Sequence, residues 1–259
     1  MVKSQQSKLK FKVTVQCIDI GNTNTHFGFY NNGVLIKEKR IPTQQIIHKN
    51  YNFIHQDIVN EFPVSYCSVV PNAEKYLVEF LKKGKFNFFN LNYKTNTILP
   101  IKYPNLSEIG QDRIANSLVA YVIDCLPSVV IDIGTATTFD VIKNNEGYVG
   151  GVIAPGPQGY LDFLHQNTAQ LPRLKITNSK ILEGIGKSTE LAMQIGTKYG
   201  YIAMVKGIIA KISEELKIST DTLNIISTGG DNSILDDISY KHIPNLTLQG
   251  LAYSYLNSL

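Results

Sequence analysis

Two similar stretches of sequence predict the fold of this chain. They are Cys17-Ile18-Asp19-Ile20-Gly21-Asn22-Thr23-Asn24-Thr25-His26 and Val130-Ile131-Asp132-Ile133-Gly134-Thr135-Ala136-Thr137-Thr138. Each stretch begins with a short apolar run that is typical of a buried strand. Each then reaches Asp-Ile-Gly, small residues, and a second strand-like run. Because each half of the chain carries one copy, the pattern indicates a duplicated unit.

The chemistry of this pattern favours a phosphate-binding turn. A strand that ends in Asp places a carboxylate at the edge of a sheet, and Gly lets the backbone turn sharply or approach a ligand. Exposed N–H groups in such a turn form an anion-binding concavity. One copy is equally typical of a plain β-turn, whereas two copies at matching places are specific. Two carboxylates at one ligand repel each other unless a cation is near, which suggests Mg-ATP.

Composition excludes several classes of protein. The 259 residues are 43% hydrophobic and 18% charged, as in ordinary globular proteins, and the net charge of +4 is too small to imply nucleic acid. Residues 1–12 lack the apolar run of a signal peptide, and no stretch reaches the roughly 20 apolar residues of a membrane span. The three cysteines have no metal-ligand spacing and predict buried, reduced thiols. We therefore expect a cytoplasmic protein that binds neither nucleic acid nor membrane.

Apolar periodicity and turn residues predict the order of the elements. Strands are expected at 13–20, 26–30, 34–41, 65–70, 86–91, 128–132, 137–143, 148–153 and 223–227. Helices are expected at 44–61, 72–83, 114–125, 159–166, 189–216 and 246–259, with a loop over 94–107. Gly196, Gly200 and Gly207 suggest close packing or a break in the helix at 189–216. The order strand, turn, strand, hairpin, strand occurs in both halves, which predicts two α/β domains at 1–114 and 115–259.

A second motif, Gly110-Gln111-Asp112-Arg113, is expected just before the helix at 114–125. An Asp near a helix N-terminus is stabilised as the anion, which makes Asp112 an available proton acceptor. The guanidinium of Arg113 offers two parallel donors to a carboxylate. Taken alone, a capped helix start with a surface salt bridge is the commoner interpretation.

Three glycine-rich segments are less specific. Gly150-Gly151 and Thr228-Gly229-Gly230-Asp231 follow predicted strands, and each is compatible with a tight turn or with a ligand close to the backbone. Gly184-Ile185-Gly186-Lys187-Ser188-Thr189 is not a P-loop, because position 181 is Ile where that motif needs Gly. We expect Ser188 or Thr189 to cap the next helix.

These motifs together resemble the type III pantothenate kinase family, within the superfamily of acetate and sugar kinases, heat-shock chaperones and actin. The matching features run in family order from about residue 13 to the C-terminus. They are Asp19-Ile-Gly-Asn-Thr23, Ser68-Val-Val-Pro71, Tyr103, Gly110-Gln-Asp-Arg113, Asp132-Ile-Gly-Thr-Ala-Thr137, Gly150-Gly-Val-Ile-Ala-Pro-Gly156, Ser188-Thr189, Thr228-Gly-Gly230 and Leu246-Thr-Leu-Gln-Gly-Leu251. The resemblance implies an α/β fold of duplicated ribonuclease-H-like (actin-like ATPase) domains with mixed sheets and an interdomain cleft.

The resemblance also implies an activity and its residues. The activity is ATP-dependent phosphorylation of pantothenate to 4'-phosphopantothenate, the first step of coenzyme A biosynthesis, by a homodimer that uses Mg²⁺ and a monovalent cation (K⁺ or NH₄⁺). Asp112 is the implied catalytic base and Asp132 the implied monovalent-cation ligand. The implied ATP-binding residues are Asp19, Ile20, Gly21, Asn22, Thr23, Asn24, Thr25, His26 and Thr135. The implied substrate-binding residues are Tyr103, Gly110, Gln111, Asp112, Arg113 and Thr189.

Two departures from the family pattern concern the substrate loops: Ser188 stands where Asn is common, and Pro104 follows Tyr103 directly. Two rival hypotheses remain open at this point. One is a kinase of the same superfamily that acts on another small alcohol, such as a sugar. The other is an ATP-binding regulatory protein without transfer activity, since proteins resembling this family have been regarded as accessory factors for gene expression.

Overall fold

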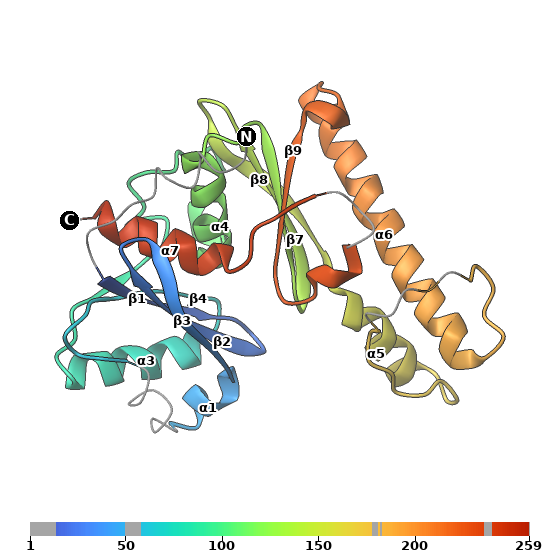
Figure 1. Cartoon of the computed structure of the whole chain (residues 1–259), viewed down its shortest axis with the longest axis horizontal. Coiled ribbons are helices and arrows are strands. Elements are labelled where there is room, and N and C mark those ends of the chain that lie inside the picture. Colours follow the sequence, from blue (N-terminus) through green and yellow to red (C-terminus); the bar gives the residue numbers. More distant parts are fainter. Residues whose placement is uncertain (1–13, 50–57, 178–180, 182, 236–239, 259) are drawn as a thin grey trace. The chain divides into compact units, whose positions relative to one another are not determined.

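The computed structural model of the chain describes residues 14–49, 58–177, 181, 183–235 and 240–258 (Figure 1). Contacts between residues divide the chain into two compact units. Unit 1 comprises residues 1–125, 142–149 and 245–259, and unit 2 comprises residues 126–141 and 150–244. The predicted domains, 1–114 and 115–259, were drawn from the repeated order of strands and not from contacts between residues. They stay a prediction.

Unit 1 is built on a five-stranded mixed sheet in the order β3-β2-β1-β4-β5. The strands are β1 (Thr14–Ile20), β2 (Asn24–Asn31), β3 (Val34–Pro42), β4 (Val64–Ser68) and β5 (Phe88–Asn90). β1, β2 and β3 pair antiparallel, which confirms the predicted three-stranded unit, and β4 pairs parallel with both β1 and β5. The carboxyl ends of β1, β4 and β5 therefore meet at one edge of the sheet.

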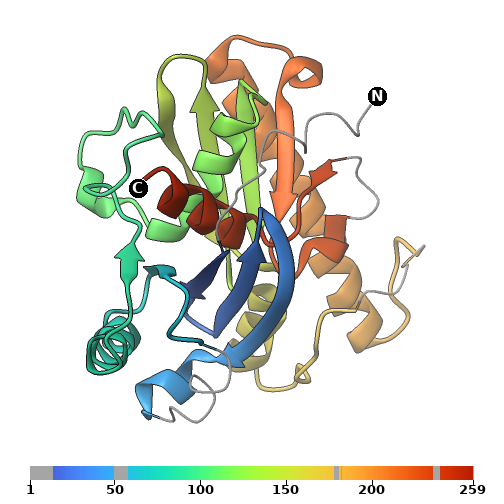
Figure 2. The same cartoon turned by 60° about the vertical axis from the view of Figure 1, so that its left-hand side comes forward.

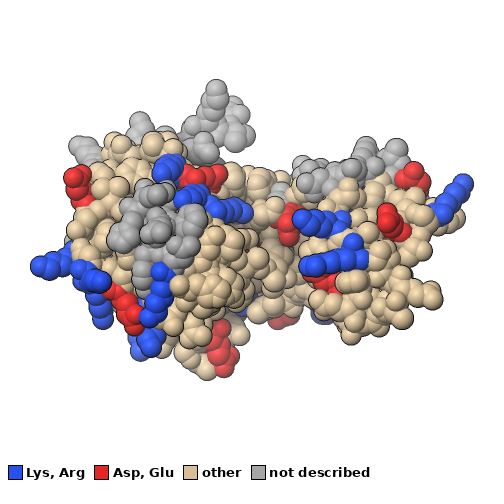
Figure 3. Space-filling view, turned by 90° about the horizontal axis from the view of Figure 1, so that it is seen from below, with Lys and Arg blue, Asp and Glu red and all other residues tan. Residues whose placement is uncertain are grey.

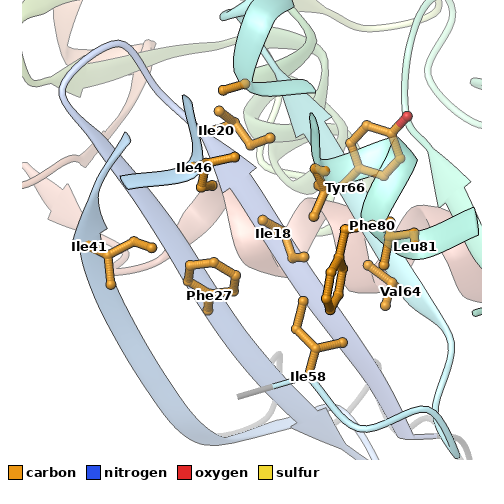
Figure 4. Close-up of a cluster of buried hydrophobic side chains, with 12 residues drawn as sticks. Ile18, Ile20, Phe27, Ile41, Ile46, Ile58, Val64, Tyr66, Phe80 and Leu81 are labelled. Carbon is orange, nitrogen blue, oxygen red and sulfur yellow. The ribbon is translucent and has the colours of Figure 1, made fainter. Parts of the chain in front are cut away.

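Alternation along β1 separates the two faces of this sheet. Ile18 and Ile20 point into a cluster with side chains from α1 (Thr43–Ile47) and α3 (Pro71–Lys83) (Figure 4). The other face is covered by α4 (Gln111–Val122) and α7 (Leu246–Leu256), which lie together (Figure 2). Asp19 is on this second face, two residues after the fully buried Cys17.

Unit 2 contains the main part of a second five-stranded sheet, in the order β10-β9-β6-β7-β8. Its strands are β6 (Ser128–Ile133), β7 (Ala136–Lys143), β8 (Gly147–Pro155), β9 (Asn224–Thr228) and β10 (Lys241–His242). β9 pairs parallel with β6 and with β10. The helices are α5 (Pro157–Asn167) and α6 (Thr189–Leu216), and α6 buries a residue every three or four positions, as an amphipathic helix does.

Most predicted elements are confirmed within two or three residues, and the differences have physical causes. The helix predicted at 44–61 is confirmed only at its start, as α1, which ends at Ile47. Lys49 has a positive φ of 56°, residues 58–62 are not helical, and 50–57 lie outside the described residues. Gly196, Gly200 and Gly207 neither break α6 nor pack closely, because a Cβ at each would meet nothing within 4 Å. Residues 1–13 and 259 also lie outside the described part.

Two surface properties bear on function. On the face drawn in Figure 3, Lys and Arg side chains are interspersed with Asp and Glu, so this face has no stripe of one sign. Among the described residues, none of the helices combines the length and apolar character needed to cross a bilayer.

Candidate functional site

The first turn, at residues 21–23, joins β1 to β2. The N–H of Gly21 donates to the carbonyl of Asn24 at 3.0 Å, which closes it. Thr43 fixes the turn, since its hydroxyl donates to the carbonyl of Gly21 at 2.6 Å and its N–H donates to the carbonyl of Thr23 at 3.0 Å. The side chains of residues 22–24 are exposed. The turn therefore presents small polar side chains to solvent from a fixed backbone.

Asp19 stands beside a buried thiol. Cys67 lies opposite Asp19 in the parallel β1–β4 register, and its Sγ donates to Oδ1 of Asp19 at 3.4 Å. Burial, and then the charges of Asp19 and Asp112, hold the pKa of the Cys67 thiol well above its usual value. Cys67 is therefore a protonated donor, and both carboxylates lie close enough to influence it.

Three predicted nucleotide-binding residues have buried side chains. Ile20 belongs to the hydrophobic core, and the hydroxyl of Thr25 lies 3.1 Å from that of Thr43. His26 is 8% exposed, and its Nε2 lies 3.1 Å from a carboxylate oxygen of Glu38. Burial, and then the charge of Arg40, lower the pKa of His26 to about 4. His26 is therefore neutral near pH 7 and offers no positive charge to a phosphate.

Asp112 lies inside the first turn of α4, which corrects the prediction that the helix begins after the motif. Gly110 is the N-cap, and Asp112 is the second helical residue. Oδ1 of Asp112 accepts a bond from the N–H of Arg113 at 2.7 Å, and a Cβ on Gly110 would lie 2.5 Å from that oxygen. Only glycine therefore leaves room for the carboxylate in this position.

The electrostatics of Asp112 also differ from the prediction. Burial raises the pKa of its carboxyl, and the opposing effects of the Arg113 N–H and of the Arg113 charge are smaller. We expected the helix N-terminus to favour the anion, but desolvation of the charged form outweighs this effect. A raised carboxyl pKa brings a general base closer to neutral pH.

Gln111 is tied to the sheet of unit 1. Its Oε1 accepts a bond from the N–H of Ser68 at 2.8 Å and another from Nδ2 of Asn90 at 2.9 Å. Ser68 ends β4 and Asn90 ends β5. The first residue of α4 is thus held at the carboxyl ends of two parallel strands.

An aromatic group accompanies Arg113. The rings of Tyr103 and Tyr148 lie 6.0 Å apart between centroids, and Cζ of Arg113 lies 5.8 Å from the centroid of the Tyr148 ring. Tyr148 is fixed by backbone bonds, with its N–H donating to Pro100 at 2.9 Å and its carbonyl accepting from Lys102 at 2.8 Å. The planar guanidinium is thereby positioned over a rigid aromatic surface.

The second turn, at residues 134–135, joins β6 to β7 in unit 2. The N–H of Gly134 donates to the carbonyl of Ala136 at 3.1 Å, and Thr135 is exposed. Two glycines pack against this turn. A Cβ on Gly156 would collide with the Gly134 and Thr135 carbonyls, and a Cβ on Gly229 would collide with the Ile133 backbone and lie 2.7 Å from Oδ1 of Asp132. Oδ1 of Asp132 therefore lies close to the main chain at Gly229.

Comparison with known proteins shows the family of this chain. The model of the type III pantothenate kinase family matches residues 16–211, more than half of the chain. A type III pantothenate kinase of Methylacidiphilum infernorum is 35% identical over 237 residues, covering 90% of this chain and 85% of that protein. The chain belongs to the type III pantothenate kinase family.

Solved structures support the fold. A Campylobacter jejuni protein described as a Baf family transcriptional activator aligns with a TM-score of 0.60 at 24% identity, covering 93% of this chain and 98% of that one. A Sinorhizobium meliloti protein described as a 2-dehydro-3-deoxygalactonokinase aligns with a TM-score of 0.52 at 9% identity, covering 93% and 97%. At these identities the likeness concerns the fold alone. Together with the two five-stranded sheets and their helices, it confirms the predicted α/β fold class.

In this member of the type III pantothenate kinase family, unit 1 brings together Asp19, Asp112 and the Arg113–Tyr103 group. Unit 2 carries Asp132, Thr135 and Thr189. Ser188 caps α6, as predicted, by accepting a bond from the N–H of Leu191 at 3.2 Å. The roles that the resemblance implies for these residues stay predictions.

Three residues in the site were missed by the sequence analysis of this family member: Cys67, Asn90 and Tyr148. Cys67 had been interpreted only as a buried apolar residue. Asn90 and Tyr148 lie in predicted strands, and no motif marks them. Only the pairing of β4 with β1 and with β5, and of residues 100–102 with Tyr148, brings them to the site.

The described residues contain no cluster of three or more His, Cys, Asp or Glu side chains suited to a metal. A divalent ion held by one or two carboxylates and by phosphate oxygens, as Mg²⁺ commonly is, needs no such cluster. The partly exposed Asp19 beside the open turn fits this mode. Oδ1 of Asp132 and the carbonyl oxygen of Ile133 both lie beside Gly229, and oxygen atoms of these kinds are the donors that hard cations prefer.

Proposed function

We propose that this chain transfers the γ-phosphoryl group of ATP to the hydroxyl of pantothenate, giving 4'-phosphopantothenate, the first step of coenzyme A biosynthesis. The observation that carries the proposal is the half-buried Asp112 with its raised pKa, at the start of α4 and beside the thiol that also bonds Asp19. In a chain of this family, that arrangement supports a base close to Asp19, the carboxylate that we assign to Mg-ATP.

Phosphoryl transfer depends mainly on positioning and on charge neutralisation. In this proposal Asp112 accepts the proton of the attacking hydroxyl and orients its oxygen toward the γ-phosphoryl group. Arg113, positioned over the Tyr148 ring, binds the carboxylate of pantothenate through its two parallel donors. Tyr103 packs against Tyr148 and would contact the apolar part of the bound pantothenate.

The nucleotide is assigned to the two turns. Residues 22–24 and Thr135 are exposed, and we propose that they contact the phosphates of ATP. Asp19 would hold Mg²⁺, which when bound neutralises the charge on the phosphates. The predicted ATP-binding segment also includes Ile20, Thr25 and His26. Their side chains are buried, and we propose that they support the turn rather than contact ATP.

We further propose that Asp132 binds a monovalent cation, K⁺ or NH₄⁺, rather than Mg²⁺. The carbonyl oxygen of Ile133 and Oδ1 of Asp132 both lie beside Gly229, and a single carboxylate with neutral oxygen donors suits a large cation of low charge. Activity measured in K⁺, NH₄⁺ and Na⁺ buffers tests this assignment. Full activity in Na⁺ with trace K⁺ excluded would contradict it, whereas Asp132→Asn should weaken activation by K⁺ and leave the Mg²⁺ requirement intact.

A homodimer is the proposed assembly, and unit 2 offers an apolar surface for it. A groove of about 820 Å³ between α5 and α6 is lined by Tyr160, Phe163, Met193 and Thr189, and Phe163 is 64% exposed. Light scattering on the purified chain should give twice the chain mass, and Phe163→Glu should reduce it. We also propose the cytoplasm as the compartment, because the buried thiols of Cys17 and Cys67 are not joined in a disulfide.

A panel of acceptors tests the proposed reaction. ADP release is followed in K⁺ and Mg²⁺ buffer with pantothenate, with common sugars and with short alcohols that lack a carboxylate. We expect turnover with pantothenate and little with the others, because Arg113 selects a carboxylated acceptor. Preference for a sugar would favour the rival kinase, and ATP binding without any transfer would favour a regulatory protein.

A further inference from the structure

We propose that Asn90 is a positioning residue for this reaction: with the N–H of Ser68, its side-chain amide holds Gln111 and thereby sets the position of Asp112. The inference deepens the proposed function, since it rests on Asp112 being the base. It also gives Gln111 a task different from the substrate contact that the family resemblance implies.

The start of α4 needs such a support. The first N–H groups of a helix have no partner within the helix, and a side-chain cap usually satisfies one of them. Gly110, the N-cap of α4, has no side chain to do so. Oδ1 of Asp112 accepts a bond from the N–H of Arg113. The side chain of Gln111 anchors this end to the sheet, because its Oε1 accepts bonds from Ser68 and Asn90.

Asn90 is itself held rigidly. Its Nδ2 also lies 3.3 Å from the carbonyl of Tyr66, and its Oδ1 accepts a bond from Nδ2 of Asn92 at 2.6 Å. Its carbonyl accepts a bond from the hydroxyl of Thr95 at 2.7 Å. The donor aimed at Gln111 is therefore fixed by the sheet on one side and by the following loop on the other.

Gln111 Oε1 has no capacity left for a substrate. A side-chain carbonyl oxygen has two lone pairs, and two donors at 2.8 and 2.9 Å occupy them. Asp112 follows directly in the chain, and its Oδ1 would be only 2.5 Å from a Cβ on Gly110. A small shift of this helical turn would therefore move the carboxylate, and a misplacement of about 1 Å can cost about 10²-fold in rate.

A double-mutant cycle on the full chain tests whether Asn90 acts through Gln111. We expect Asn90→Ala and Gln111→Ala each to lower kcat about 10-fold, with the KM for ATP changed less than about 2-fold. The double variant should be no slower than Gln111→Ala alone. An unchanged kcat in Asn90→Ala, or an equal loss from it in both backgrounds, would overturn the proposal.

Two further variants separate positioning from general stability. Asn90→Asp keeps the shape and the acceptor for Asn92 but cannot donate to Gln111, so it should show the same loss of kcat. Asn87→Ala is the matched control, because Nδ2 of Asn87 bonds the hydroxyl of Tyr255 at 3.2 Å and does not reach α4. Its kcat should equal that of the wild type.

A second readout does not depend on the acceptor. The carboxyl of Asp112 is titrated by ¹³C NMR, with its signal assigned by its loss in Asp112→Asn. Its pKa should fall toward the ordinary value in Asn90→Ala, because a loosened helix start admits water, and it should stay unchanged in Asn87→Ala. An unchanged titration in Asn90→Ala overturns the inference, whereas failure of the wild type to phosphorylate pantothenate counts against the proposed function alone.

Discussion

The turn at residues 21–23 is held by a threonine, whereas the turn at 134–135 is held by two glycines. In unit 1 the hydroxyl and the N–H of Thr43 bond the turn from behind. In unit 2 the main chain at Gly156 and Gly229 packs directly against the turn, where no side chain fits. Two nearly identical sequences, Asp19-Ile-Gly21 and Asp132-Ile-Gly134, are thus supported by different interactions.

This difference agrees with the two proposed tasks. The first turn is supported from behind and stays open to solvent, as a phosphate-binding segment must be. In the second turn, Oδ1 of Asp132 and the carbonyl oxygen of Ile133 both lie beside Gly229, and such oxygen donors suit a cation. The proposed base, Asp112, and the carboxylate of Asp19 both lie close enough to the Cys67 thiol to raise its pKa. Both copies share the strand-turn-strand arrangement, and we expect their different surroundings to determine what each copy binds.

The largest expected effect is at the second turn. Gly229→Ala should lower the free energy of unfolding by about 3 kcal/mol, since its φ of 101° is unfavourable for Ala and the new Cβ collides with Ile133. Urea unfolding measures this change. Gly134→Ala is the control, because its Cβ would meet no atom closer than 3.9 Å. Equal losses in both variants would show that close glycine packing does not support this turn.

Asp112→Asn tests the base beside the first turn. We expect kcat to fall about 10²-fold or more while ATP still binds. Because burial raises the folded-state pKa of Asp112, ionisation at neutral pH destabilises the native state. The stability contributed by the proton is complete below about pH 4 and is lost as the pH rises through the folded pKa. Asp112→Asn should therefore unfold at a higher temperature than the wild type at pH 7, with the difference disappearing toward pH 3. A lower melting temperature at pH 7 would contradict the burial argument.

The sequence predicted much of the fold and a pair of phosphate-binding turns, because these depend on local interactions. It missed features that depend on contacts between distant residues. Asp-Ile-Gly after an apolar run predicts a strand and a turn from local interactions alone, and both turns are confirmed. The start of α4 was misplaced because Gly110 is an N-cap without a side chain. The side chain that anchors this end, Gln111, bonds residues 43 and 21 positions away in the sequence. Cys67, Asn90 and Tyr148 reach the site only through strand pairing and loop contacts, which no local pattern encodes.

A moderate effect is expected at the first turn. Thr43→Val removes the hydroxyl that donates to Gly21 at 2.6 Å, which should cost about 1 to 2 kcal/mol of stability. The KM for ATP should rise several-fold, with kcat less affected. Thr14→Val serves as the control, because its hydroxyl bonds only the exposed Asn31 side chain at 3.3 Å. Unchanged ATP binding in Thr43→Val would remove the distinction between the two turns.

The smallest expected effect concerns Cys67. Its thiol is a weak donor to Asp19, so Cys67→Ala should raise the KM for ATP only about 2-fold, and Cys67→Ser, which keeps a donor, should restore it. Cys17→Ala, which changes a buried thiol of the same sheet, should leave this KM unchanged. If the Ser and Ala variants behave alike, the bond to Asp19 has no part in ATP binding.

The most direct test of the central claim is a single-turnover measurement of 4'-phosphopantothenate formation from pantothenate and Mg-ATP in K⁺ buffer, with wild type and Asp112→Asn compared. We expect the wild type to form one product per ATP consumed, and Asp112→Asn to bind ATP with similar affinity but to react about 10²-fold more slowly. Product formation at equal rates in both proteins, or ATP binding by the wild type with no phosphopantothenate formed, would contradict the account.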